Sequence, residues 1–114
     1  MSESFSTVTV LGALRQPVQM QTFPSGSQCG TFDLLLREQT ATGSWFTVVV
    51  PCQVWGKGVE VSRTLRRGQP CVFTGKLARC KTQEGYVLGV SGFSLEPLDL
   101  PAPLPEASAY AHRN

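Results

Sequence analysis

The residues with reactive side chains are few, and they are not arranged as a catalytic or metal site. The chain has four cysteines, Cys29, Cys52, Cys71 and Cys80, and its single histidine is His112 near the C-terminal end. No two cysteines have the C-x-x-C spacing of a zinc site, and no glycine-rich phosphate loop is present. No histidine lies elsewhere in the sequence to activate a serine or cysteine. These observations argue against an enzyme, a metal or another cofactor, and they predict buried, reduced thiols.

Aromatic and basic residues, by contrast, are interleaved along the chain. Flat rings stack on bases and cations follow phosphates, so this pattern is typical of a groove for a single nucleic-acid strand. Trp45 and Phe46 are adjacent and should point to opposite faces of a strand, one to the core and one outward, where it would stack on a base or contact another subunit. Tyr86 lies in a predicted hairpin with Arg79 and Lys81. Phe32, Phe73 and Phe93 are predicted to be core residues because they alternate with other apolar residues.

Strand-like runs separated by turn residues must position these side chains. Runs rich in Val, Thr and aromatic residues, or alternating with period two, predict strands. Gly75 predicts a bend in one of them. The expected strands are Ser6–Leu14, Gln28–Glu38, Ser44–Trp55, Gln69–Cys80 and Tyr86–Leu95, with a short extended stretch through Phe23. A helix is expected at Lys57–Leu65, with Arg66 and Arg67 in its last turn and Gly68 after it.

Five strands with one short helix between the third and fourth strands predict an all-β protein, an OB-fold barrel. Residues 1–98 would form this domain, and residues 99–114, rich in Pro and Ala, a flexible tail. Residues 1–95 contain nine Lys or Arg against five Asp or Glu, a net charge of +4, which suits a polyanionic partner.

Four sequence fragments between Val8 and Leu98 resemble bacterial single-stranded DNA-binding proteins. Val50–Glu60 (VPCQVWGKGVE) is similar to the family's F-I-P-C-x-x-W-G-K-x-A-E, and Leu65–Leu77 to its Y-L-x-K-G-x-x-V-x-V-E-G-x-L. Softer matches are Leu11-Gly12 followed by Pro17, and the Pro24–Gly26 turn before Phe32-x-Leu34. The family ends in an acidic tip with a terminal Phe, whereas this sequence ends His112-Arg113-Asn114. The tail-less primosomal replication protein N is therefore a natural comparison, as are plasmid- and phage-borne versions.

The resemblance implies sequence-independent binding of single-stranded DNA in replication, recombination or repair. It places Trp55 at a base-stacking position, and strand parity also turns Trp55 away from Cys52 and Val54. Lys57 and Arg67 match basic positions of the family. Arg79, Lys81, Arg37 and Arg15 are further candidates for phosphate contacts.

Two alternatives remain open from the sequence. An OB fold could hold protein partners in a primosome-like assembly, and Trp55 could be an ordinary core residue. A homodimer or homotetramer is expected through the uncharged strand Ser6–Leu14, unless Gly12 twists this edge away and leaves a monomer. The sequence shows no signal peptide and no apolar run of membrane-spanning length, so we expect a cytoplasmic protein without membrane contacts.

Overall fold

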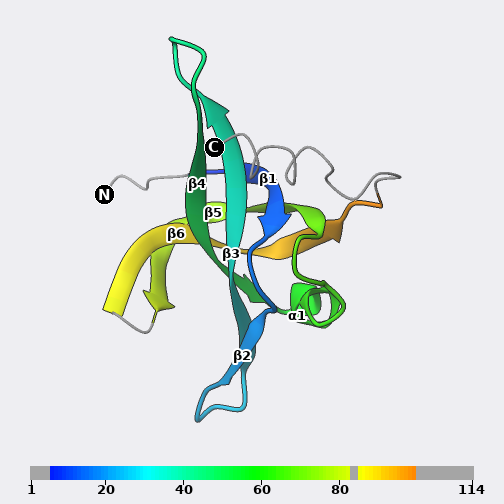
Figure 1. Cartoon of the computed structure of the whole chain (residues 1–114). Coiled ribbons are helices and arrows are strands. Elements are labelled where there is room, and N and C mark those ends of the chain that lie inside the picture. Colours follow the sequence, from blue (N-terminus) through cyan, green and yellow to red (C-terminus); the bar gives the residue numbers. More distant parts are fainter. Residues whose placement is uncertain (1–5, 83–84, 100–114) are drawn as a thin grey trace.

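The computed structural model describes residues 6–82 and 85–99. Within them the protein is mostly β, with six strands and one short helix (Figure 1). The elements, in chain order, are β1 (Val8–Leu14), β2 (Gln19–Thr22), β3 (Gln28–Gln39), β4 (Trp45–Trp55), α1 (Lys57–Ser62), β5 (Pro70–Thr82) and β6 (Gly85–Pro97). Among these residues no helix is long and apolar enough to span a membrane. Nearly all of the predicted tail, from residue 100 onward, lies outside the described part of the chain.

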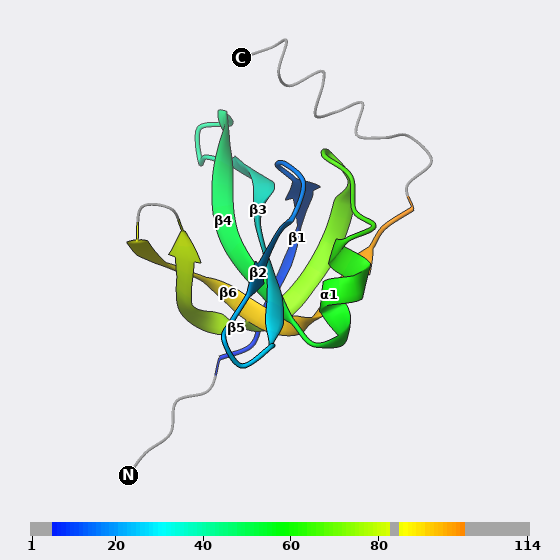
Figure 2. The ribbon, with the colours of Figure 1, turned by 90° about the horizontal axis from the view of Figure 1, so that it is seen from below.

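Five of the strands close into a barrel. The sheet runs in the order β1-β5-β6-β4-β3-β2, and β1 also pairs with β3 at Ala13↔Leu35 and Leu14↔Leu34, which closes the ring. β4 and β6 are parallel, and the other pairs are antiparallel. β2 lies outside the closed ring and pairs with the first residues of β3, from Gln28 to Thr31. In the view from below, the strands surround the core and α1 lies at one side (Figure 2). This architecture matches an OB-fold barrel.

The position of the helix corrects one prediction. The stretch before Phe23, expected to be merely extended, pairs with β3 over Gln19–Thr22 and is a strand. The helix therefore follows the fourth strand, between β4 and β5, and not the third. It also ends at Ser62 and not at Leu65. The hydroxyls of Ser62 and Thr64 donate to the carbonyls of Val59 and Val61 at 2.7 Å, which competes with further helical bonding. Arg66 and Arg67 consequently lie beyond the helix.

The core fills the barrel with side chains from all five strands of the ring. Phe32 and Phe73 are buried, as predicted, and meet edge to face with ring centroids 5.4 Å apart. Phe93, predicted to be buried, is 69% exposed, so that prediction is wrong. Gly75 marks a register shift between β5 and β6, which confirms the bend expected there. A Cβ at Gly75 would lie 2.4 Å from the Ser91 carbonyl oxygen, so the bend brings the two backbones together.

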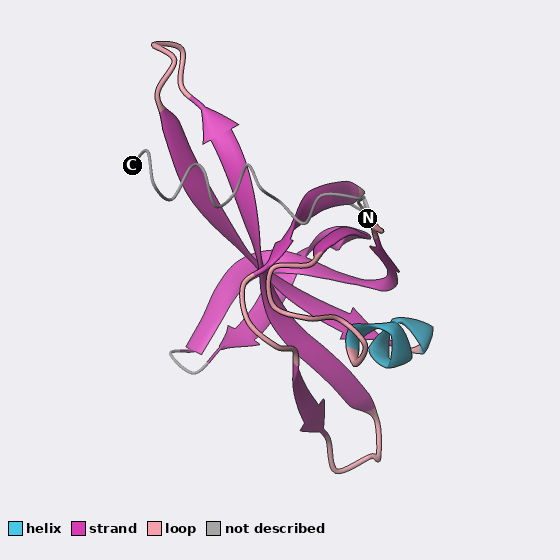
Figure 3. Ribbon diagram, turned by 45° about the vertical axis from the view of Figure 1, so that its right-hand side comes forward, coloured by secondary structure: helices cyan, strands magenta, loops and turns pink. Residues whose placement is uncertain are grey.

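The β3–β4 and β5–β6 hairpins extend beyond the barrel, as Figure 3 shows. We call them the β3–β4 arm (residues 36–49) and the β5–β6 arm (residues 77–82 and 85–88). Trp45 is 41% and Phe46 46% exposed at the end of the first arm. The prediction that one of them enters the core is therefore wrong. They do point to opposite faces, but the arm projects from the barrel, so neither ring enters the core.

Candidate nucleic-acid interface

Trp55 ends β4 as a half-buried ring that is held on two sides. Its indole Nε1 donates a hydrogen bond to Ser91 Oγ on β6, at 3.2 Å. One side of the indole stacks on Phe23, with centroids 5.4 Å apart and planes 20° apart. Phe23 is placed by the turn before β3, where its N–H donates to the Ser27 carbonyl and its own carbonyl accepts from Gly26. Trp55 is thus turned away from the core, as strand parity predicts, and its orientation is fixed.

Phe93 supplies a second ring at the same place. In the parallel pair of β4 and β6, Gln53 lies opposite Ser91, so Trp55 and Phe93, two residues further along each strand, share a face. A Cβ added at Gly56 would lie 3.0 Å from Phe93 Cδ1, and Gly56 has a φ of 62°. Glycine therefore satisfies two needs here, because it adopts the left-handed backbone and lets the phenyl ring lie against the chain.

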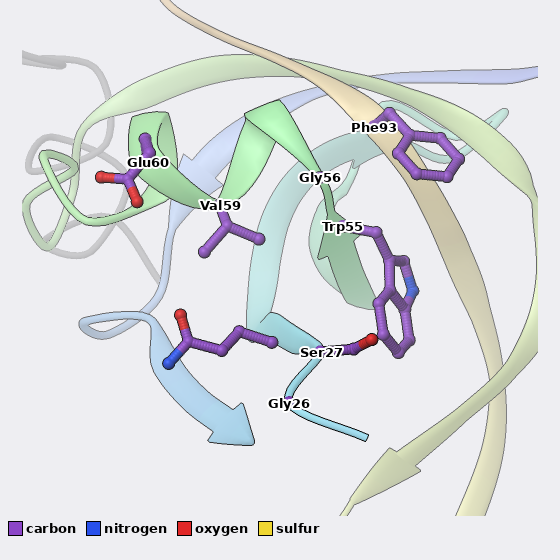
Figure 4. Close-up of a pocket in the computed structure, with 8 residues that line it drawn as sticks. Gly26, Ser27, Trp55, Gly56, Val59, Glu60 and Phe93 are labelled. Atoms are coloured by element: carbon purple, nitrogen blue, oxygen red, sulfur yellow. The ribbon is translucent and has the colours of Figure 1, made fainter. Parts of the chain in front are cut away.

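The two rings line one end of an open groove of about 410 Å³ (Figure 4). Its other walls come from the turn before β3 and from the first turn of α1. The lining side chains are those of Ser27, Gln28, Trp55, Val59, Glu60 and Phe93. Phe23, which stacks on the indole, is not among the residues that line the groove. The groove therefore offers a planar ligand aromatic surface and a polar rim.

Each arm carries an aromatic ring paired with an arginine. On the β5–β6 arm, Tyr86 is 63% exposed and the Arg79 guanidinium lies 5.1 Å from its ring centroid. On the β3–β4 arm, Arg37 lies at the same distance from the Trp45 ring. Cation–π pairing keeps each guanidinium beside its ring. Arg79 is exposed, so the β5–β6 arm presents a flat surface together with a positive charge. Arg37 is half-buried and its Nε and Nη2 atoms are buried, so the β3–β4 arm presents its rings with little of that charge.

The remaining basic candidates are dispersed. Lys57 is exposed and follows Gly56, which lines the groove, but Lys57 itself is not among the lining residues. Arg67 is exposed in the turn after α1, where Gly68 N–H donates to the Leu14 carbonyl, and it does not line the groove. Arg15 forms an ion pair with Asp33 at 3.3 Å, which offsets its charge. The backbone of Lys81 pairs with Tyr86 on the β5–β6 arm; the structure does not describe its side chain.

Comparison with known proteins supports the architecture. No family model matches the sequence, and no curated protein is significantly similar to it. Among solved structures, the Plasmodium falciparum SSB in complex with ssDNA superposes with a TM-score of 0.73 at 17% sequence identity, over 87% of this chain and 99% of that chain. The fold is that of an OB-fold protein. At 17% identity, this similarity shows a shared fold but does not show a shared function.

The four cysteines are buried and free, in agreement with the prediction for them. Burial raises the pKa of each thiol, for Cys71 from 9.0 to about 11. For Cys52 the neighbouring Cys80, Cys71 and Asp33 add to the increase in pKa. Thiols in this state are poor nucleophiles because the thiolate is the reactive form. The described residues also contain no group of three or more His, Cys, Asp or Glu placed to hold a metal ion.

Sequence reasoning missed the residues that complete the site around Trp55. Phe23 and Ser91 hold the indole, Phe93 extends its aromatic surface, and Gln28 and Glu60 form the polar rim. Only two of them could have been found from the sequence. Phe23 is the aromatic residue next to the predicted Pro24–Gly26 turn, and Glu60 lies in the fragment that resembles the bacterial family. Phe93 and Ser91 depend on the parallel pairing of β6 with β4, which leaves no local signal.

Proposed function

We propose that the protein binds single-stranded DNA without catalysing a reaction, by stacking bases on Trp55 and Phe93. The observation that carries this proposal is the groove itself, where two rings from adjacent parallel strands share one open face. A binder of single strands needs such rings, because every base has a stacking face. Lys57, exposed and next to Gly56 in the chain, would supply a cation for the phosphate chain.

The two arms extend the proposed track. Tyr86, Trp45 and Phe46 are exposed rings on hairpins that project from the barrel (Figure 3). Arg79, exposed beside Tyr86, would meet phosphates, together with Lys81 on the β5–β6 arm and Arg67 after the helix. Arg37 is a weaker candidate because its Nε and Nη2 atoms are buried beside Trp45. Arg15 is the weakest candidate because of its ion pair with Asp33. A DNA strand that follows these residues would place several of its nucleotides on one OB fold.

The structural comparison supports the choice of ligand. The Plasmodium protein of the same fold is an SSB that was solved with ssDNA, and nearly all of that chain is covered by the superposition. From the resemblance of the sequence to bacterial single-stranded DNA-binding proteins we further propose roles in replication, recombination or repair, with replication or primosome proteins as partners. A location in the cytoplasm is proposed from the sequence alone.

The proposal is tested by comparing single and double strands of the same sequence. We expect the single strand to bind much more tightly than the duplex, since the described residues offer no helix long enough to enter a major groove. Affinity should fall by about 0.7 log unit per log unit of salt for each phosphate neutralised. Equal affinity for the two forms, or a flat salt response, would contradict the proposal.

A protein-interaction module is the second candidate function, and one observation favours it. Leu77 is 50% and Leu88 69% exposed on the β5–β6 arm. Aliphatic side chains exposed together on a hairpin are typical of a protein contact more than of base stacking. A pure adaptor should show no affinity for the oligonucleotide, so the same titration distinguishes the two functions.

We also propose that the protein is a homodimer or homotetramer. Within the described residues, β1 pairs with β3 only at Ala13 and Leu14, so its edge at Val8–Gly12 lacks a second partner strand. Leu11 in this stretch is 60% exposed. An uncharged open edge with an exposed apolar side chain favours pairing with a copy of itself.

A further inference from the structure

The groove beside Trp55 is aromatic at one end and polar at the other. Trp55 and Phe93 lie at one end, and the carboxylate of Glu60 lies on the opposite rim, with Val59 between them (Figure 4). The amide of Gln28 belongs to the same rim, because Gln28 and Glu60 contact the same guanidinium, that of Arg63. Among the described residues that line it, Glu60 is the one that carries a charge, and that charge is negative. Arg63, which does not line the groove, forms an ion pair with this carboxylate and offsets its charge. The described lining itself holds no cation for a phosphate, so the groove is suited to a neutral base.

A guanidinium fixes the polar rim. Arg63 donates from Nη2 to Gln28 Oε1 at 2.8 Å, and its Nη1 lies 3.2 Å from Glu60 Oε1. The Gln28 amide nitrogen in turn donates to Thr22 Oγ1 at 3.3 Å. Both polar groups of Gln28 are thereby engaged within the protein. Glu60 Oε2 makes no hydrogen bond among the described residues, so it is the acceptor that the rim offers to a ligand.

We infer that this groove takes one base of the bound strand and that Glu60 gives it a preference for bases that present an amino group, so that cytosine is favoured over thymine. The inference rests on the proposed function and specifies it. A base lying against the rings directs its edge toward the rim. Cytosine carries the N4 amino donor, which a carboxylate accepts well, whereas thymine carries the O4 acceptor at that position and is repelled.

The test compares dC and dT homopolymers of about 15 nucleotides, which fit the track of one OB fold. The two bases are both pyrimidines, and a homopolymer presents the same base in every register. Binding is measured by fluorescence anisotropy in slightly alkaline buffer, where cytosine N3 is unprotonated. We expect the ratio of dC to dT affinity to fall about fivefold in the Glu60→Gln variant, because an amide can both donate and accept.

Two further variants serve as a charge control and as a second way of removing the Glu60 carboxylate. Glu96→Gln removes the same charge from an exposed position on β6 that does not line the groove, and its ratio should match that of the wild type. Glu60→Ala should lose the preference as Glu60→Gln does, and thermal melts check that the variants are folded. A ratio that is unchanged in both Glu60 variants, while both oligomers bind, would overturn the inference and leave the proposed function intact. Failure of the wild type to bind either oligomer would overturn both.

Discussion

The indole of Trp55 and the hydroxyl of Ser91 are joined by a hydrogen bond of 3.2 Å between neighbouring parallel strands. This bond engages the single polar group of the indole, and Phe23 stacks on one of its sides. The part of the indole that stays open to a ligand is therefore aromatic. It has no free hydrogen-bond donor that could distinguish one base from another. The ring is also held in place before binding, which lowers the entropy cost of stacking.

Ser91→Ala should therefore weaken the binding of single-stranded DNA without unfolding the protein. The free indole N–H would lose a hydrogen bond worth about 1 kcal/mol, and the ring would gain freedom to rotate. We expect an affinity several-fold lower and, in a Trp45→Phe background where Trp55 is the sole tryptophan, a lower steady-state fluorescence anisotropy. Ser91→Thr keeps the hydroxyl and suits a strand, so it should restore both values. If Ser91→Ala binds as tightly as the wild type, Ser91 does not position Trp55.

The Trp55→Ala variant distinguishes between two roles of Trp55, base stacking and packing in the core. Loss of stacking should cost about 1–3 kcal/mol of binding free energy. A fully buried tryptophan would instead cost about 3–5 kcal/mol of folding stability on truncation. Trp55 is half-buried, so we expect the larger effect in the DNA titration and a smaller one in the thermal melt. A large fall in the melting temperature, with unchanged affinity of the folded fraction for DNA, would assign Trp55 to the core.

Strand periodicity predicted the elements and the two faces of each strand well. It placed Cys52 and Val54 inward and Trp55 away from them, because alternation fixes parity. Periodicity gave wrong predictions of burial at some positions, because alternation separates the two faces of a strand but does not show whether other elements cover a given face. Phe93 is on the face that β6 shares with Trp55, outside the barrel, and this depends on parallel pairing between strands far apart in sequence. Trp45 and Phe46 point to opposite faces of an arm that projects from the barrel, so neither enters the core and both are exposed.

The buried thiols should make stability fall at alkaline pH. Cys71 has a pKa of about 11 in the folded protein against an ordinary 9.0, so between these values the unfolded chain loses a proton that the folded chain keeps. Its contribution to stability is complete below pH 9.0 and declines as the pH rises toward about 11. Urea unfolding at about pH 8 and about pH 10 measures this decline. Cys71→Ala should show a smaller decline than the wild type; an equal one would assign the effect to other groups.

The same thiols should resist alkylation in the native state. All four are buried, and the raised pKa of each keeps the thiolate scarce near neutral pH. We expect negligible modification of the folded protein by iodoacetamide, and modification of all four cysteines in urea, as counted by mass spectrometry. Rapid labelling of one cysteine in the native protein would show that its pocket opens.

The open edge of β1 predicts self-association. The protein should have a mass of two or four times 12.4 kDa by light scattering at micromolar concentration. Leu11→Lys places a charge on the exposed edge, and charged side chains on edge strands prevent pairing. This variant should shift the mass toward 12.4 kDa while its melt remains cooperative. A wild type that already has the monomer mass would refute the interface.

The stacking of a base on Trp55 is tested most directly by its own fluorescence. The chain has two tryptophans, so Trp45→Phe leaves Trp55 as the sole reporter. Titration of this variant with single-stranded DNA should quench its emission saturably, with the same midpoint as binding measured by anisotropy, and a duplex of the same sequence should quench far less. Anisotropy that reports tight binding without quenching, or no binding at all, would contradict the account.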